Sequence, residues 1–206
     1  MGDYYQTIVD VEVMEEESPE LAERIVSWLH DEGVIDRLRT SPKYANGTMY
    51  LFGARATEVV QDATYFLGDY EGSVARYDVS PDEPLVFNVH LDVVTRRSVV
   101  WTTGMSLECL ACGAEIGDWD GQCVRKHVFD SWVDAAADWE KGAEGLFGCP
   151  DCGHVLPVTQ WKQGDWPWGF GNLAFWFWNY GLLKDGFVQE FARRLGHRIV
   201  VPRGKL

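Results

Sequence analysis

Four cysteines stand in two short turns of the same type. Each turn reads Cys, two residues, Cys and then Gly: Cys109-Leu-Ala-Cys112-Gly113 and Cys149-Pro-Asp-Cys152-Gly153. The glycine after the second cysteine permits the positive φ that a tight metal-binding turn needs. Four thiolates held in two such turns favour one tetrahedral zinc ion, and they leave no open position for catalysis at the metal. The sequence therefore predicts one structural Zn²⁺, bound by Cys109, Cys112, Cys149 and Cys152.

Other uses of these thiols remain open at the level of sequence. They could be reduced cysteines in a core, or a thioredoxin-like redox pair, although redox motifs do not come as two paired turns. The fifth cysteine, Cys123, lies between the pairs; we interpret it as a small buried hydrophobic residue, with a replacement ligand or a reactive thiol as alternatives. His154 follows the second turn, where we expect it to support the ligands from outside or to be exposed.

The elements that must position these turns are indicated by periodicity. Alternation at Val9, Val11 and Val13 predicts a strand over residues 7–13. Ser18, followed by Pro19 and Glu20, predicts a helix start with Ser18 as N-cap, and Gly33 predicts its end. Turn-forming residues at 40–55 precede a predicted short helix at 56–66.

The second half of the chain gives clearer patterns. Alternation over 85–93 predicts a strand, and a turn at Arg96 and Arg97 predicts a hairpin with residues 98–102. A helix is predicted at about 130–141. Residues 173–179, aromatic on both faces, predict a central strand; a helix from 184 to Gly196 and a strand at 199–201 follow.

Together these elements predict an α+β fold, a split α/β sandwich with a partly antiparallel sheet and an inserted zinc ribbon with four cysteine ligands. Two domains are predicted: residues 1–104 plus 161–206 form the α+β domain, and residues 105–160 form the inserted ribbon. The sequence contains no internal repeat.

The two cysteine turns resemble those of the zinc-ribbon family over residues 107–155, with a longer spacer than the shortest ribbons have. The beginning of the chain (YYQTIVDVEV, SPELAERIVSWL) and its end (GFGNLAFWFWNYGLL) resemble a family of uncharacterised actinobacterial proteins. The first resemblance implies a structural zinc and no particular activity. The second implies a cytoplasmic bacterial protein.

Charge is distributed unevenly along the chain. The formal net charge is -14, and residues 1–83 carry 18 acidic against 6 basic side chains, a net charge of -12. Such a surface repels phosphate backbones and attracts basic partners, although it also serves solubility alone. No apolar run is long enough to span a bilayer and no signal peptide is apparent, so we expect a cytoplasmic protein without a membrane partner.

Two polar groups of residues outside the cysteine turns could do chemistry. Asn88, His90 and Asp92 share one face of a predicted strand and could include a general base, but no nucleophile motif accompanies them. Asp118, Asp120 and Gly121 resemble a fragment of a calcium loop that lacks its remaining ligands, so a solvated turn is expected. We therefore predict no catalytic and no cofactor-binding residues besides the zinc ligands.

Two further segments suggest binding. Residues 162–171 (KQGDWPWGFG) are either core or a rigid loop that presents aromatic anchors. Residues 184–206 have a net charge of +4, but they contain no nucleic-acid recognition motif, so nucleic acid is not expected as a partner.

The leading functional hypothesis is a protein-binding module with a structural zinc, of the immunity or antitoxin type, that binds and neutralises a basic toxin domain. Its binding surface would be the acidic N-terminal part or the aromatic segment at 161–171. The alternatives are a small hydrolase-type enzyme centred on His90 and Asp92, and a zinc-ribbon nucleic-acid binder.

Overall fold

The computed structural model describes residues 3–41, 48–62, 89–102, 104–117, 126–165 and 167–205. Its helical elements are α1 (Ser18–Asp31), α3 (Lys126–Glu140), α4 (Asp185–Leu195) and the 3-10 turns η1 (Ala56–Val59) and η2 (Val158–Gln160). The strands of the first half are β1 (Tyr4–Asp10), β2 (Ile35–Ser41), β3 (Thr48–Phe52), β4 (His90–Val94) and β5 (Ser98–Val100). The later strands are β6 (Leu107–Glu108), β7 (Glu115–Ile116), β8 (Leu146–Gly148), β9 (Val155–Pro157), β10 (Lys162–Gln163), β11 (Gly169–Gly171), β12 (Leu173–Trp178), β13 (Ile199–Val200) and β14 (Arg203–Lys205).

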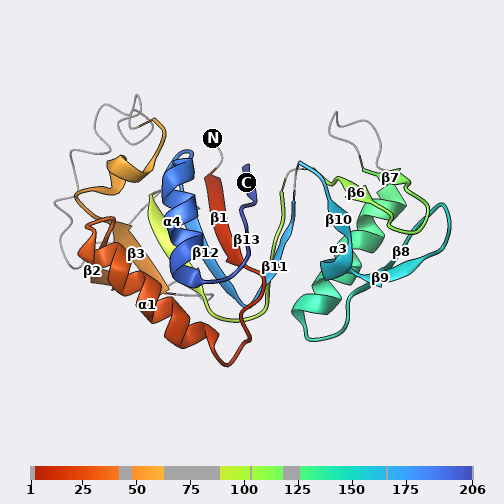
Figure 1. The fold of residues 1–206 in the computed structure, drawn as a ribbon, viewed down its shortest axis with the longest axis horizontal. Helices are drawn as coiled ribbons and strands as arrows, with labels where there is room; N and C mark the ends of the chain where they lie inside the picture. Colours follow the sequence, from red (N-terminus) through yellow and green to blue (C-terminus); the bar gives the residue numbers. More distant parts are fainter. Residues whose placement is uncertain are drawn as a thin grey trace.

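One antiparallel sheet, the main sheet, organises half of the molecule. Its described strands follow the order β13-β1-β12-β4-β3-β2, and β14 also pairs with β1. Helices α1 and α4 lie on one side of it (Figure 1). The fold is therefore α+β with antiparallel sheets, which confirms the predicted class.

Helix α1 forms because apolar residues recur at helical spacing behind a proline start. Leu21, Ile25 and Leu29 form its buried stripe. Ser18 is not the N-cap, which corrects the prediction: Glu17 occupies that position, and the Ser18 hydroxyl donates to the carbonyl of Glu15. The predicted end is confirmed by the positive φ of +70° just after the helix, at Gly33.

The core of the main sheet lies under these two helices. Alternate residues of the central strand, Leu173, Phe175 and Phe177, face the helices and are buried. They pack with Phe191 of α4, whose ring makes edge-to-face contacts with Phe175 at 4.9 Å and Phe177 at 6.2 Å. β12 is thus the central strand that was predicted, between β1 and β4.

The opposite face of the main sheet is covered in part by β5 and β11, which pair with each other and which we call the arm. Val100 of the arm packs with Tyr5, Val9, Val94 and Ala174 of the sheet. The approach is close: a Cβ on Gly171 would lie 2.2 Å from the carbonyl oxygen of Asp10. The arm therefore needs glycine where it touches the sheet.

Beyond the arm lies the cysteine module, which consists of α3 and the strands β6 to β10 (Figure 1). It has its own aromatic core around Trp132 of α3, which is fully buried. Phe170 of the arm joins this core, with its ring 5.9 Å from that of Trp132. Successive residues of β11 thus face opposite sides, as in any strand. Phe170 points to the module, whereas Gly169 and Gly171 face the main sheet.

Two further sequence predictions, both about strands, need correction. Residues 98–102 form no hairpin with the preceding strand: β4 pairs with β12 and β3, whereas β5 pairs with β11. After the turn the chain continues toward the module and does not fold back on β4. Hydrogen bonds from the Arg97 guanidinium to the carbonyls of Trp139 and Ala143 in the module favour this direction. Residues 40–55 hold part of a strand pair, β2 and β3, rather than turns alone.

The first strand is also displaced from the prediction. It ends at Asp10 because that carboxylate accepts hydrogen bonds from the backbone N–H groups of Glu12 and Val13, which turns the chain. The predicted helix at 56–66 is represented by η1, and residues 63–66 lie outside the described ranges.

Candidate functional site

The two cysteine turns have the same backbone hydrogen bonds. In the first, Cys109 N–H donates to the carbonyl of Ala114 (2.9 Å) and Gly113 N–H to that of Cys109 (2.8 Å). In the second, Cys149 N–H donates to His154 (2.8 Å) and Gly153 N–H to Cys149 (2.9 Å). The glycines have φ values of +72° and +73°, as the CxxCG pattern predicted.

The four sulfur atoms meet where the turns face each other. All lie within 4.8 Å of one another. Cys109 Sγ is 3.7 Å from Cys152 Sγ, and Cys112 Sγ is 3.8 Å from Cys149 Sγ. A tetrahedron with metal–sulfur bonds of about 2.3 Å has edges of about 3.8 Å, so the cluster fits a tetrahedral metal ion. These separations are far too long for disulfides.

The backbone around the cluster favours the thiolate form of one ligand. Burial raises the pKa of the Cys109 thiol, but hydrogen bonds from the N–H groups of Cys112 and Ala111, together with those from the neighbouring Cys112 and Cys149 thiols, lower that pKa to about 7. The N–H of Ala114 lowers the pKa of Cys112, whereas hydrogen bonds with neighbouring thiols and burial raise it to about 12. One thiolate thus forms near neutral pH, and a bound cation would allow the others to ionise with it.

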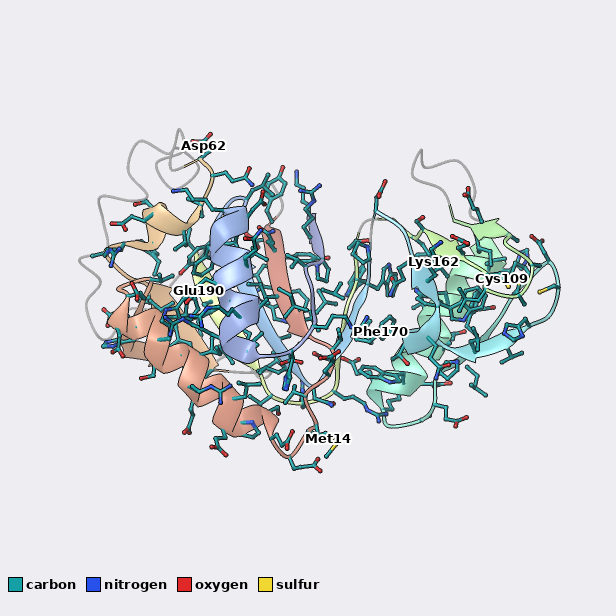
Figure 2. All side chains as sticks on the ribbon, in the orientation of Figure 1. Met14, Asp62, Cys109, Lys162, Phe170 and Glu190 are labelled. Atoms are coloured by element: carbon teal, nitrogen blue, oxygen red, sulfur yellow. The ribbon has the colours of Figure 1, made fainter. Side chains whose placement is uncertain are left out.

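Aromatic residues of the module core pack on the buried side of the cysteine cluster. Cys109 and Cys149 are buried, while Cys112 and Cys152 are exposed. Phe147, two residues before Cys149, packs its ring 5.3 Å from Trp132 and 5.2 Å from Trp161. Figure 2 shows Cys109 and Glu190 of α4 in opposite halves of the molecule. The cluster therefore lies within the module, away from the helices of the main sheet.

His90 and Asp92 do lie together, on the arm side of β4. His90 Nε2 is 3.4 Å from Asp92 Oδ2, and the Trp178 indole N–H donates to the same oxygen at 3.0 Å. The His90 and Trp178 rings are stacked, 6.1 Å apart. His90 Nδ1 is buried, and Nε2 is the ring nitrogen on the side of Asp92.

The aromatic segment at 162–171 belongs to the core where the structure describes it. Trp168 and Phe170 are buried, as is Trp161 just before them. The alternative of an aromatic binding loop is therefore wrong for these side chains; Trp166 lies outside the described residues.

Other candidate residues from the sequence lie mostly outside the described part of the chain. Cys123, Asn88 and the Asp118, Asp120, Gly121 group all lie outside the described ranges. His154 is exposed, one of the two positions expected for it, and its carbonyl serves the second turn.

Arginine side chains of the basic C-terminal part pair with acidic and aromatic side chains of the same protein. Glu190 binds both Arg193 (2.7 Å) and Arg194 (2.6 Å), and the Arg194 guanidinium lies 4.5 Å from the centre of the Trp28 ring. Arg198 lies 3.5 Å from Glu12. These pairs leave little free positive charge on α4 for a phosphate backbone.

Sequence reasoning missed the aromatic residues beside Asp92. Trp176 and Trp178 are partly buried, and their rings stack at 5.4 Å with an interplanar angle of 10°. Both face the arm side, together with Tyr5, whose hydroxyl donates to the carbonyl of Trp101. The spacing of two within β12 was a usable signal, because residues i and i+2 of a strand share a face.

No helix in the described ranges is long and apolar enough to cross a membrane. The chain matches no protein-family model, no curated protein and no solved structure.

Proposed function

We propose that the protein is a non-catalytic binding protein of the immunity or antitoxin type, which uses a structural zinc and neutralises a basic toxin domain. The observation that carries this proposal is uncompensated negative charge at the start of α1. Glu15, Glu16, Glu17, Glu20 and Glu23 are all exposed, and none forms an ion pair with a described residue.

Part of this charge has a local role. Glu17 and Glu20 flank the N-terminus of α1, where the helix dipole favours carboxylates. Glu15, Glu16 and Glu23 gain less from the dipole, whose effect falls off within the first turn. Met14, 54% exposed, lies beside them and adds apolar contact area. A carboxylate-rich surface of this kind accelerates association with a basic protein and disfavours acidic ones.

Zinc is the metal that suits the cysteine cluster best. Four thiolates at tetrahedral spacing are typical of structural zinc sites, with iron as the chemical alternative. We propose that residues 105–160 form an inserted zinc ribbon, which the ion holds in its folded shape. Elemental analysis of the purified protein should find one zinc per chain; iron would give the visible absorption of iron–thiolate bonds.

The geometry favours neither alternative function. A hydrolase centred on His90 would need an accessible ring nitrogen and a neighbouring nucleophile, and the two nitrogens are buried or directed at Asp92. A nucleic-acid binder would need free cations, and those of α4 are paired with carboxylates.

Affinity capture from the native secretome tests the partner. The wild-type protein should retain one basic protein in stoichiometric amount. Glu15→Gln/Glu16→Gln/Glu17→Gln should lose it, because the attraction comes from these carboxylates.

The matched control is Asp130→Asn/Asp134→Asn/Asp138→Asn, which changes the net charge equally on the exposed side of α3. This control should keep the partner. Equal retention by both triple variants, or no basic protein retained by the wild type, would reject the proposal.

A further inference from the structure

We propose that Asp92, Trp176 and Trp178 form a binding site for a guanidinium group, and that the group is an arginine side chain of the protein partner. This inference rests on the proposed function for its source of arginine. The site itself follows from the arm-side face of the main sheet.

Strand register brings these side chains together. Trp176 of β12 is the cross-strand partner of Asp92 in β4, and Trp178 is the partner of His90. All four residues face the arm side, because they alternate with Leu91 and Phe177, which face the helices. Cross-strand partners on one face have side chains in contact distance. The carboxylate and the two indoles are therefore fixed by the sheet.

The Asp92 carboxylate is held in one orientation. Its Oδ2 atom accepts the Trp178 indole N–H at 3.0 Å and lies 3.4 Å from His90 Nε2. Oδ1 accepts no hydrogen bond from the described residues, and the side chain is 24% exposed. Asp92 is thus a positioned acceptor with one oxygen available to a donor from outside.

The neighbours of Asp92 suit a planar cation. Trp178 is stacked with Trp176 on one side and with His90 on the other, and it turns its N–H edge to Asp92. Trp176 is partly buried and is the cross-strand partner of Asp92, so a cation that pairs with Oδ1 would lie near its electron-rich ring. A guanidinium is weakly hydrated and donates in a fixed fork, whereas an ammonium is strongly hydrated and costs more to bring into a partly buried site.

The charge and chemistry of the rest of the molecule agree with this ligand. The net charge of -14 favours the approach of cations over that of anions. The protein already pairs arginine with tryptophan twice in its described part: Arg194 lies 4.5 Å from the Trp28 ring centre and Arg97 lies 4.9 Å from that of Trp139. A guanidinium from a partner would make a third arginine–tryptophan contact, and it would also pair with the Asp92 carboxylate.

The test uses the full chain with a short arginine peptide, acetyl-Gly-Arg-Gly-amide, and its citrulline analogue, which has the same shape without the charge. Heteronuclear NMR at neutral pH follows the indole N–H signals of Trp176 and Trp178, assigned with single Trp→Phe variants. The arginine peptide should shift both signals saturably, and the citrulline peptide should bind at least about tenfold more weakly.

Two variants decide whether Asp92 and the indoles carry the binding. Asp92→Asn should weaken the arginine peptide at least about tenfold, since it removes the charge and keeps an acceptor for Trp178. Trp176→Leu leaves the hydrogen bond between Trp178 and Asp92 in place and should weaken binding several-fold. Asp134→Asn on α3 has the same charge change as Asp92→Asn and should bind as the wild type does.

Equal binding of the citrulline peptide, or unchanged binding by Asp92→Asn with a native spectrum, would overturn the site. The source of the cation is tested separately, by partner capture with Asp92→Asn. Retention of the basic partner at wild-type strength would overturn the assignment to the partner's arginine while the proposed function stands. Loss of that partner only in Asp92→Asn, and not in Asp134→Asn, supports it.

Discussion

At the scale of single residues, the cysteine cluster makes the sharpest prediction. Cys149→Ser should lower the zinc content well below one per chain and unfold the cysteine module, because the hydroxyl is a poor zinc ligand and Cys149 is also part of the module's core. Cys123→Ser is the control. Elemental analysis and circular dichroism give both readouts, and zinc loss in Cys123→Ser instead would mean that the ligand set is wrong.

Gly171 gives a second prediction, which concerns the contact between the arm and the sheet. A Cβ there would lie 2.2 Å from the Asp10 carbonyl oxygen and 2.7 Å from a methyl group of Val9. Gly171→Ala should therefore destabilise the protein by about 2 kcal/mol or more, measured by denaturant unfolding.

Gly186→Ala serves as the control for this change. An added Cβ on Gly186, near the start of α4, meets no atom within 4 Å. Alanine has the higher helix propensity, so this variant should be neutral or more stable by up to about 1 kcal/mol. If Gly171→Ala were as well tolerated, the close contact between arm and sheet would not exist in solution.

At the scale of elements, α4 predicts a pH dependence. Side-chain hydrogen bonds from Arg193 and Arg194 lower the pKa of Glu190 from the ordinary 4.5 to about 2. A lowered carboxyl pKa means that the folded state favours the ionised form, so the stabilisation is fully present above about pH 4.5 and disappears as the pH falls through about 2.

Unfolding of the wild type and of Glu190→Gln across this range provides the measurement. The wild type should be the more stable protein at neutral pH, by a small margin because the pair is at the surface. The difference should shrink between about pH 4.5 and pH 2. A constant difference would indicate that Glu190 acts through packing and not through its charge.

Elements also show how far the sequence alone could predict the fold. Helix α4 was predictable because its apolar face and Gly196, with a φ of +78°, are local signals. The pairing of β5 with β11 was not, because it joins residues about seventy positions apart and depends on contacts of Arg97 with α3. The two glycines of β11 resemble turn residues in sequence, whereas they serve close packing against Val9 and Asp10.

The candidate sites follow the same rule. The cysteine turns are complete in five residues each, so the cluster could be predicted from the sequence. The environment of Asp92 could be predicted only in part: His90 is two residues away, but Trp176 and Trp178 come from a strand about eighty residues later. A local sequence pattern does not identify which residue of a distant strand lies opposite a given residue in the sheet.

At the scale of the whole molecule, the separate cores predict that the two sides respond differently to metal removal. A strong zinc chelator at neutral pH should broaden or shift the NMR signals of the module core around Trp132, and leave those of Ile8 and Phe175 in the main sheet nearly unchanged. Residues of β11 should respond weakly, since Phe170 packs with the module.

The same chelator saturated with zinc is the control and should have no effect. Loss of signal dispersion throughout the chain would show that the main sheet depends on the metal. No change anywhere would exclude a metal from the folding of the module.

Strand order in the main sheet also has a consequence for biosynthesis. In the described part of the chain β1 pairs with β12, β13 and β14, so the strand that leaves the ribosome early has no sheet partner until residues 173–205 follow. All four cysteines of the cluster have been translated by residue 152. The cysteine cluster is therefore able to assemble on a nascent chain in which β1 is not yet paired, and Val9 and Tyr5 of β1 are exposed to chaperones during that interval.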